Sequence, residues 1–295
     1  MLSEIPPLLV AVLRNFGSVR LNRNMIGFTV ETRTPPLNAE AFQAFARATR
    51  DRTYLNAENF TVAPPLLLAK LTIPMLKSVC YHPDLKMNPL RMVHAGQTLC
   101  RHRTLAAGDR VSLTLCVEAI ERTAAGDKLS LSGRAYTGDT LAVEGVTELI
   151  VRTRKRAKRL KIPKEGRKER FRTDIVTVEG QQIEYAAVSG DRNIIHTHNL
   201  AARLAGLPRS IMHGACLLAM YCDALTRATA ANDYGRFNSI RGRFRRPVLP
   251  GQLLTLVGYD ALQAGKIEFD VINPDGQTVF SDGLFAFNPS PLNAG

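Results

Sequence analysis

Residues 211–229 read I-M-H-G-A-C-L-L-A-M-Y-C-D-A-L-T-R-A-T, the apolar stretch around which the rest of the chain is expected to fold. Small and apolar residues recur in it at helical spacing, at Ala215, Leu218, Ala219 and Cys222. Because the flanking positions are apolar as well, the pattern predicts a helix that is buried nearly all round. Such a helix needs another layer of structure to cover it, and the rest of the chain must supply that layer.

The residues that follow this stretch predict an antiparallel meander. Extended segments are expected at residues 237–244, 252–261, 266–273 and 278–287, and the intervening N-P-D-G at 273–276 is typical of a hairpin turn. A helix followed by antiparallel strands indicates the α+β class. A long apolar helix wrapped by a curved antiparallel sheet accounts for all of these elements.

The chain holds two copies of one structural unit. Residues 45–56 (F-A-R-A-T-R-D-R-T-Y-L-N) align with residues 185–196 (Y-A-A-V-S-G-D-R-N-I-I-H) at a shift of 140, and later identities keep the same order. Two such units side by side would form one continuous sheet. Before its strands, each copy predicts an extended segment (19–31; 172–178), a short helix (39–49; 181–189), an irregular loop and a longer apolar helix (66–80; 211–229).

The 295 residues carry 39 Lys+Arg and 26 Asp+Glu, a net charge of +13, and most of that charge lies in one segment. Residues 152–172 alone carry a net charge of +10, which leaves +3 for the rest of the chain. A basic run that contains Pro163 and Gly166 cannot bury apolar surface, so it predicts a solvated linker. We therefore expect a first unit at residues 1–151, the linker at 152–172 and a second unit at 173–295.

The position of the charge also bears on partners. A basic chain suggests nucleic-acid binding, but outside the basic segment the positive and negative charges of the two units nearly cancel. With 6% aromatic residues and no Trp, base stacking cannot be dominant, so we do not expect a nucleic-acid partner. The basic linker could instead attract an anionic partner, such as a nucleotide phosphate or an acidic carrier protein, although an exposed linker is the simpler interpretation.

The sequence lacks the signals of a membrane or secreted protein. No stretch of 18 apolar residues occurs, and no acceptable cleavage site follows the short N-terminal apolar run. The five cysteines are odd in number and lack metal-ligand spacing. We therefore expect a soluble, cytoplasmic protein with reduced thiols, no membrane span and no metal site.

The second copy contains S-G-D-R-N-I-I-H at residues 189–196, followed by a His-Gly pair at the start of the apolar helix. Asp191 and His196 are five residues apart in a loop and could converge on one small ligand. A carboxylate and an imidazole together can hold a water, remove its proton and return a proton elsewhere. The backbone N–H of Gly214, at the positive end of the helix, suits an oxygen that becomes negative. These groups would suffice to add water across an activated double bond.

The same residues also allow a purely structural interpretation. Asp and Asn are common in turns because their side chains bond their own backbone. His196 could be a satisfied interior histidine, and His213 could be an ordinary residue at a helix start. Spacing alone favours this interpretation.

Three segments together resemble the MaoC-like family of (R)-specific enoyl-CoA hydratases and 3-hydroxyacyl-thioester dehydratases. They are S-G-D-R-N-I-I-H, I-M-H-G-A at 211–215, and R-G-R-F-R-R-P-V-L-P-G-Q-L-L at 241–254. The chain departs from the family pattern at Ile194, where Pro is usual, and at Ala215, where Met is common. The resemblance implies the hot-dog fold and, over residues 10 to 290, its double form.

The resemblance also implies an activity and a set of roles. The reaction is the reversible hydration of trans-2-enoyl thioesters, carried by coenzyme A or acyl carrier protein, to (3R)-3-hydroxyacyl thioesters, with no cofactor of the enzyme's own. Asp191 and His196 resemble the pair that activates water, and Asn193 would orient their loop. The N–H of Gly214, beside His213, resembles the donor to the thioester carbonyl.

The first copy keeps only part of this pattern. Asp51 is retained, Asn56 stands where His196 is, and Arg50 replaces Gly190. An amide cannot shuttle a proton as imidazole does, so we expect this copy to be catalytically inactive. The family resemblance suggests that it houses the acyl chain, through the apolar residues 64–76.

Several alternatives remain open at this stage. The strand-borne Arg241, Arg243, Arg245 and Arg246 could meet the phosphates or acidic surface of a carrier, or they could form a solvated face. Hot-dog folds also support thioesterases, so hydrolysis is the second candidate activity. A non-catalytic acyl or nucleic-acid binder is the third. Two units in one chain can already pair with each other, which leaves both monomer and homodimer possible.

Overall fold

The structure is a computed structural model that describes residues 10–12, 15, 20–57, 61–152 and 166–289. Its α-helices are α2 (Ala39–Thr49), α3 (Arg52–Leu55), α4 (Leu67–Leu71), α5 (Ile73–Cys80), α6 (Gln181–Ser189), α7 (Ile194–Thr197), α8 (Asn199–Leu204) and α9 (Gly214–Thr229). Short 3₁₀ turns are η1 (Arg23–Met25), η2 (Pro83–Leu85), η3 (Pro89–Arg91) and η4 (Tyr234–Arg236). The strands are β1 (Thr29–Arg33), β2 (Met92–Arg101), β3 (Ser112–Thr123), β4 (Gly126–Thr137), β5 (Thr140–Arg152), β6 (Glu169–Val176), β7 (Phe237–Phe244), β8 (Leu253–Asp260), β9 (Lys266–Ile272) and β10 (Thr278–Phe287).

All ten of these strands form one antiparallel sheet in the order β1-β3-β4-β5-β2-β7-β10-β9-β8-β6. The order on either side of the centre is the same when each half is read inward from its edge, as expected for a duplicated unit. The halves meet where β2 pairs with β7, from Gly96 opposite Arg243 to Cys100 opposite Ser239. The two copies therefore share one continuous sheet, as the sequence predicts.

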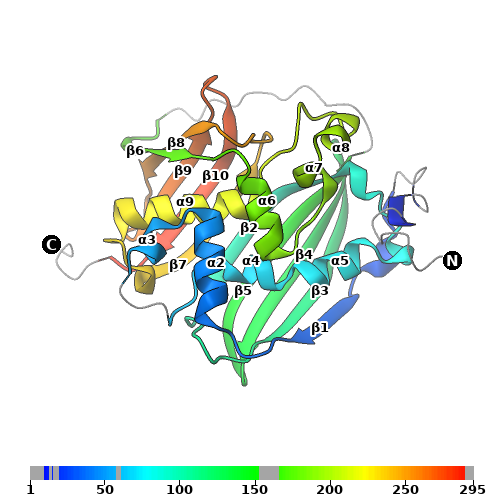
Figure 1. The fold of residues 1–295 in the computed structure, drawn as a ribbon, viewed down its shortest axis with the longest axis horizontal. Coiled ribbons are helices and arrows are strands. Elements are labelled where there is room, and N and C mark those ends of the chain that lie inside the picture. The colour runs from blue at the N-terminus through cyan, green and yellow to red at the C-terminus, as the bar shows by residue number, and fades with distance from the viewer. Residues whose placement is uncertain (1–9, 13–14, 16–19, 58–60, 153–165, 290–295) are drawn as a thin grey trace.

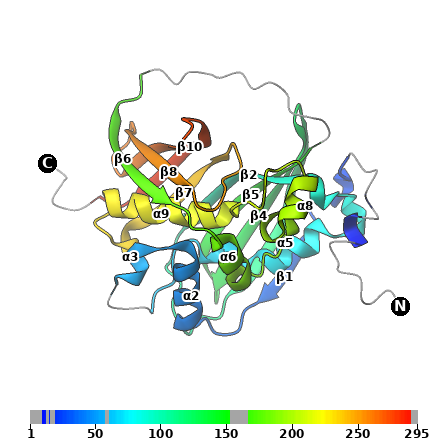
Figure 2. The same ribbon diagram turned by 45° about the horizontal axis from the view of Figure 1, so that its top comes forward.

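The helices lie on one face of this sheet (Figure 1). In the second half, α9 crosses the strands, and every residue from Cys216 to Thr226 is buried. In the first half, α4 and α5 take the corresponding place over β3, β4 and β5, and the 45° turn in Figure 2 shows both layers again. The architecture is α+β, with a central helix layer wrapped by a curved sheet in each half.

Some element boundaries differ from the sequence-based expectation. The helix expected at residues 66–80 is two helices that meet at Thr72, because Pro74 has no N–H to continue the ladder and sits instead in the first turn of α5. The second-half helix begins at Gly214 rather than at 211. The irregular loop before it contains α7 and α8, which are too short to show helical periodicity.

The ends of the basic segment are part of the sheet. Arg152 is the last residue of β5, and Glu169 pairs with Tyr259 at the start of β6, so strands extend into both ends of the expected linker. Its centre, residues 153–165, lies outside the described residues. Across the described part of the chain, no helix is both long and apolar enough to cross a membrane.

Candidate active site

The loop between α6 and α7 carries the polar residues that the sequence singled out. Gly190 ends α6 in the left-handed region, with φ 76°, a conformation that favours glycine. Asp191 Oδ1 then accepts a hydrogen bond from the N–H of Asn193 (3.3 Å), and Asn193 Oδ1 accepts one from the N–H of Ile195 (3.4 Å). Asp191 and Asn193 therefore form the local turns that the sequence suggests. These turns set the position of His196, three residues after Asn193.

Two backbone carbonyls set the protonation of the site's histidines. His196 Nδ1 lies 2.8 Å from the carbonyl oxygen of Ile211, and His213 Nε2 lies 2.9 Å from that of Asp191. Since a carbonyl can only accept, each of these nitrogens carries the hydrogen, which leaves a lone pair on His196 Nε2 and on His213 Nδ1. The two rings stack with centroids 3.8 Å apart.

Burial keeps both imidazoles neutral. His196 is 9% exposed and His213 is 1% exposed. Burial lowers the pKa of His196, and the nearby Asp191 carboxylate opposes that shift in part. Burial and the neighbouring His196 lower the pKa of His213 well below its ordinary value. Near neutral pH, His196 is therefore available as a base.

One carboxylate oxygen of Asp191 and one ring nitrogen from each of His196 and His213 lie within 4.8 Å of one another. Among the described residues, these three side chains are close enough together to ligate a metal ion, and so are Cys100, His102 and Glu144 near β2 and β5. The same spacing suits a carboxylate and an imidazole that share a water. The expectation that the site works without a metal stays a prediction.

The amino end of α9 forms the opposite side of the site. Its cap residue His213 makes no side-chain hydrogen bond to the helix within the described residues, and no described acceptor pairs with the N–H of Gly214. The 16-residue helix directs its positive end at this point. A Cβ on Gly214 would lie 2.7 Å from His94 Nδ1 and 3.1 Å from Phe244 Cζ, so only glycine fits.

His94 is a residue that the sequence pattern did not reveal. It lies on β2 in the first half, 120 residues before Gly214, so no local spacing connects the two. Its ring packs on Phe244 of β7 with centroids 4.5 Å apart. The pairing of β2 with β7 brings it to the amino end of α9, and that pairing could not be read from either strand alone.

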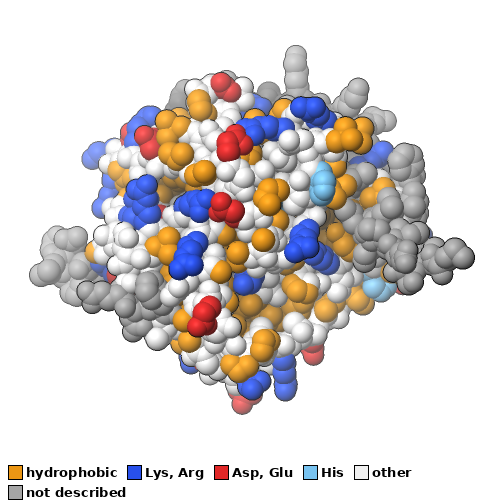
Figure 3. Space-filling view, in the orientation of Figure 1, with side chains coloured by type: hydrophobic (Ala, Val, Ile, Leu, Met, Phe, Trp, Pro, Cys, Tyr) orange, Lys and Arg blue, Asp and Glu red, His pale blue; other side chains and the backbone are white. Residues whose placement is uncertain are grey.

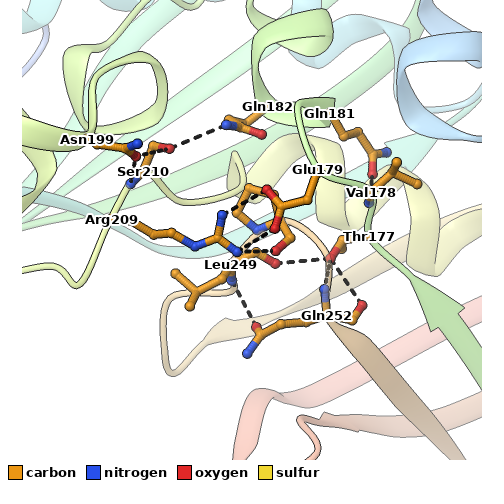
Figure 4. A network of polar contacts seen from close by, with 11 residues as sticks. Thr177, Val178, Glu179, Gln181, Gln182, Asn199, Arg209, Ser210, Leu249 and Gln252 are labelled. Carbon is orange, nitrogen blue, oxygen red and sulfur yellow. Dashed lines mark hydrogen bonds and ion pairs between the residues drawn. The ribbon is translucent and has the colours of Figure 1, made fainter.

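A polar network holds the segment between the loop at residues 190–193 and α9 in place (Figure 4). Arg209 donates to both carboxylate oxygens of Glu179, at 2.7 and 2.8 Å, and to the carbonyl of Pro250. Asn199 Oδ1 accepts from the backbone and the hydroxyl of Ser210. This network joins α8 to the loops that flank β6 and β8, so the acceptor carbonyl of Ile211 is held against His196.

The four arginines of the 241–254 segment do not gather at this site. Arg241 and Arg243 are exposed on β7 and face away from Phe244, because successive strand residues point to opposite faces. Arg245 is bonded to Ser281 and Asp282 on β10. Arg246 is partly exposed. Lys and Arg side chains on the helix face are also scattered among apolar ones rather than gathered in one patch (Figure 3).

The corresponding place in the first half is filled by protein side chains. Asp51 is 2% exposed and caps α3, and Tyr234 hydrogen-bonds to its carboxyl. Arg101 donates to the carbonyls of Tyr234 (2.6 Å) and Gly235 (2.9 Å). Asn56, the residue at the His196 position, ends α3. This half therefore has no imidazole at the position of His196, and its Asp51 carboxyl is buried and already hydrogen-bonded.

The apolar residues 64–76, suggested as an acyl-chain site, are closely packed here. Leu66, Leu67 and Met75 are each 2% exposed. The cavity beside them, lined by Ala63, Pro64 and their neighbours, is about 10 Å³. A larger cavity of about 460 Å³ lies beyond α3, lined by polar residues that include Arg52 and Asn56. An acyl chain would have to displace side chains to enter the 64–76 segment.

The buried Asp51 predicts an unusual pH dependence of stability. Burial and the neighbouring Asp223 raise the pKa of Asp51 from 3.8 to about 7. The folded state thus holds the Asp51 proton more tightly than the unfolded chain does. The stability that this proton contributes is fully present below pH 3.8 and is lost as pH rises through about 7. Asp51→Asn, which keeps a capping oxygen, should gain stability relative to wild type across this window, by about 1 kcal/mol or more at pH 8.

Denaturant unfolding of both proteins at several pH values between 4.5 and 8 measures this difference. Asp139→Asn, at an exposed turn, is the matched control and should give a difference that does not change with pH. A constant difference for Asp51→Asn over the whole range would contradict the prediction.

Comparison with known proteins bears on both halves of the chain. Residues 161–260 match the family model described as "MaoC like domain", and residues 24–140 match "FAS1-like, dehydratase domain region". The 3-hydroxyacyl-thioester dehydratase Y of Mycobacterium tuberculosis is 30% identical over 216 residues, which cover 68% of this chain and 74% of that protein.

Solved structures agree on the fold. A MaoC-like dehydratase from Phytophthora capsici superposes with a TM-score of 0.74 at 23% identity, covering 91% of this chain and 98% of the other. A Mycobacterium tuberculosis protein described as having a double hotdog fold superposes with a TM-score of 0.60 at 12% identity, covering 89% and 96%. The chain belongs to the MaoC-like dehydratase family and has its double hot-dog fold.

Proposed function

We propose that this chain is a hydro-lyase of fatty-acid metabolism that interconverts trans-2-enoyl thioesters and (3R)-3-hydroxyacyl thioesters. One observation carries the proposal. The Asp191 carboxylate, the lone pair of His196 Nε2 and the amino end of α9 at Gly214 belong to one small site of the second half. The 30% identical relative is named a 3-hydroxyacyl-thioester dehydratase, which is the same reaction in reverse.

In the hydration direction, Asp191 and His196 hold the attacking water between them. His196 Nε2 takes one proton as the water oxygen bonds to C3, and a proton is returned to C2. Between these events, negative charge develops on the thioester oxygen, where the Gly214 N–H and the positive end of α9 stabilise it. Water and the enoyl thioester are consumed together with no change of redox state, so the reaction needs no cofactor.

The proposal also includes the division of the chain, the carrier of the substrate and the setting in which the protein acts. The chain divides into a first, non-catalytic unit (1–151), a basic connection (152–172) and a second, catalytic unit (173–295). Asn193 positions the loop, and His213 holds Asp191 through its carbonyl. The thioester carrier is coenzyme A or acyl carrier protein, and Arg241, Arg243, Arg245 and Arg246 and the basic connection are the cationic groups that would meet its phosphates. The protein acts in the cytoplasm as a monomer or homodimer, without nucleic acid.

Crotonyl-CoA is the substrate that tests the activity. We expect its enoyl absorbance to fall without release of free thiol, and chiral analysis should identify (3R)-3-hydroxybutyryl-CoA. Release of thiol at the rate of substrate loss would mean that the chain is a thioesterase instead. Salt-sensitive binding with no turnover would favour a non-catalytic binder.

A further inference from the structure

We propose that His94, from the non-catalytic first half, contacts the reacting atoms and accepts a hydrogen bond through Nδ1 from the hydroxyl group that forms at C3. This inference rests on the proposed function and names one more residue of that site. It would also explain what the first half contributes to catalysis although its own loop is inactive.

The backbone of β2 is irregular at His94. The pairing of β2 with β5 changes register between His94 and Gly96, which leaves Ala95 as the extra residue. Such bulges bend a strand, redirect a side chain and are common beside active sites. Here the bulge lies at the end of β2 that faces the amino end of α9, and the His94 ring packs against Phe244 there.

The neighbours of His94 fix which nitrogen is the acceptor. Its Nε2 lies 3.1 Å from the carbonyl oxygen of Gly96 and 3.1 Å from Oε1 of Gln97. Thr147 also donates to that Gln97 oxygen, and the Gln97 amide nitrogen donates to Thr98. Because Nε2 faces only acceptors, it carries the hydrogen, and Nδ1 keeps its lone pair.

Nδ1, for which no hydrogen-bond partner is seen among the described residues, points at the proposed site. It lies 2.7 Å from where a Cβ of Gly214 would be. The charged and titratable groups that act on His94 are Asp191 and His196. Burial lowers the pKa of His94 to about 4, and His196 contributes in the same direction, so the ring is a neutral acceptor at working pH.

An acceptor at this place has a defined use in hydration. The attacking water has two hydrogens, of which His196 takes one and the other stays on the new 3-hydroxyl group. C3 is two bonds from the carbonyl carbon, so a group beside Gly214 can reach the oxygen on C3 when the carbonyl is bound to the Gly214 N–H. Nδ1 would accept a hydrogen bond from this second hydrogen, which stays bonded to the oxygen. A hydroxyl group left unpaired beside the buried His196 and His213 would be unfavourable.

Two substitutions separate this role from a structural one. His94→Asn places an acceptor at the Nδ1 position but lacks the Nε2 donor, whereas His94→Gln keeps a donor near Nε2 and lacks the Nδ1 acceptor. We expect His94→Asn to retain kcat for crotonyl-CoA within about threefold. His94→Gln and His94→Leu should lose about 10- to 100-fold in kcat with little change in KM. Since His94 stays neutral, the pH profiles above pH 5.5 should remain parallel.

If the Gly96 and Gln97 contacts are what matters, the order reverses and His94→Gln is the more active variant, which would overturn the proposal. Equal activity of all three variants and wild type would overturn it as well. A binding measurement needs no turnover: (3R)-3-hydroxybutyryl-CoA should bind wild type more tightly than butyryl-CoA, and His94→Gln should reduce that preference at least fivefold. An unchanged preference would contradict the role of His94, whereas failure of wild type to hydrate crotonyl-CoA would count only against the proposed activity.

Discussion

His196→Ala should lower kcat/KM for crotonyl-CoA hydration by about three orders of magnitude, because it removes the base whose Nε2 lone pair faces the water. The carbonyl of Ile211 fixes this lone pair by accepting the Nδ1 hydrogen at 2.8 Å. Alanine has no group that could replace it, and Asp191 alone lacks a partner to hold the water. Initial rates of loss of the enoyl-thioester absorbance measure the effect, and the variant should come close to a blank that contains substrate but no enzyme.

 

Two controls accompany this variant. His198→Ala removes an exposed histidine two residues further on, whose Nδ1 contacts only Thr197 Oγ1 among the described residues, and its rate should stay within about twofold of wild type. Thermal melting of both variants checks that the fold is kept. If His196→Ala retained near wild-type turnover with a normal melt, the mechanism would be wrong.

The pH profile of the wild type gives an independent measure of the same group. Hydration needs His196 neutral, and burial lowers the pKa of His196 below its ordinary 6.5. The enzyme should therefore keep its kcat/KM as pH falls through 6.5 and lose activity only on further acidification. An acid limb centred above pH 6.5 would contradict this assignment of the base.

Gly214→Ala is expected to lower kcat by about 100- to 1000-fold, the loss typical of removing one donor to a developing oxyanion. The methyl group would lie 2.7 Å from His94 Nδ1 and 3.1 Å from Phe244 Cζ, so the first turn of α9 or the two rings must shift. Either shift moves the N–H away from the thioester oxygen or places the methyl group in its path. Steady-state kinetics with crotonyl-CoA measures the effect.

Gly133→Ala is the matched control for this substitution. It lies on β4 in the first half, and its nearest new contact would be Leu115 Cδ1 at an ordinary 3.6 Å. We expect this variant to keep wild-type kcat. Gly214→Ala with wild-type kcat would show that the amino end of α9 does not bind the reacting oxygen.

Much of the secondary structure could be predicted because it depends on local patterns. The helices 39–49 and 181–189 and the strands 237–244 and 278–287 have the predicted bounds, since apolar periodicity and turn residues define them. The break at Thr72 was missed although Pro74 is visible in the sequence, because the apolar run continues across it. The helices α7 and α8 were missed because four to six residues give no periodicity.

Some residues of the candidate site could likewise be predicted from the sequence, and others could not. Asp191, Asn193 and His196 lie within six residues, so one loop motif identifies them and their turn chemistry fixes their order. Gly214 was expected from its position at the start of the apolar helix, and the family resemblance gave the same residue. His94 and the carbonyl of Ile211 carry no such signal, because their importance depends on which strand and which loop lie opposite them.

The α+β class, the duplication and the loop that carries Asp191 and His196 could be predicted from the amino-acid sequence, because each depends on residues that are neighbours or repeats along the chain. The tautomers of the two stacked histidines, the hydrogen bond of Tyr234 to the buried Asp51, and the approach of His94 to Gly214 became visible only in the folded chain. Those features arise from contacts between different elements, some of them in different halves, and the β2–β7 pairing that brings the halves together is not encoded in either strand alone.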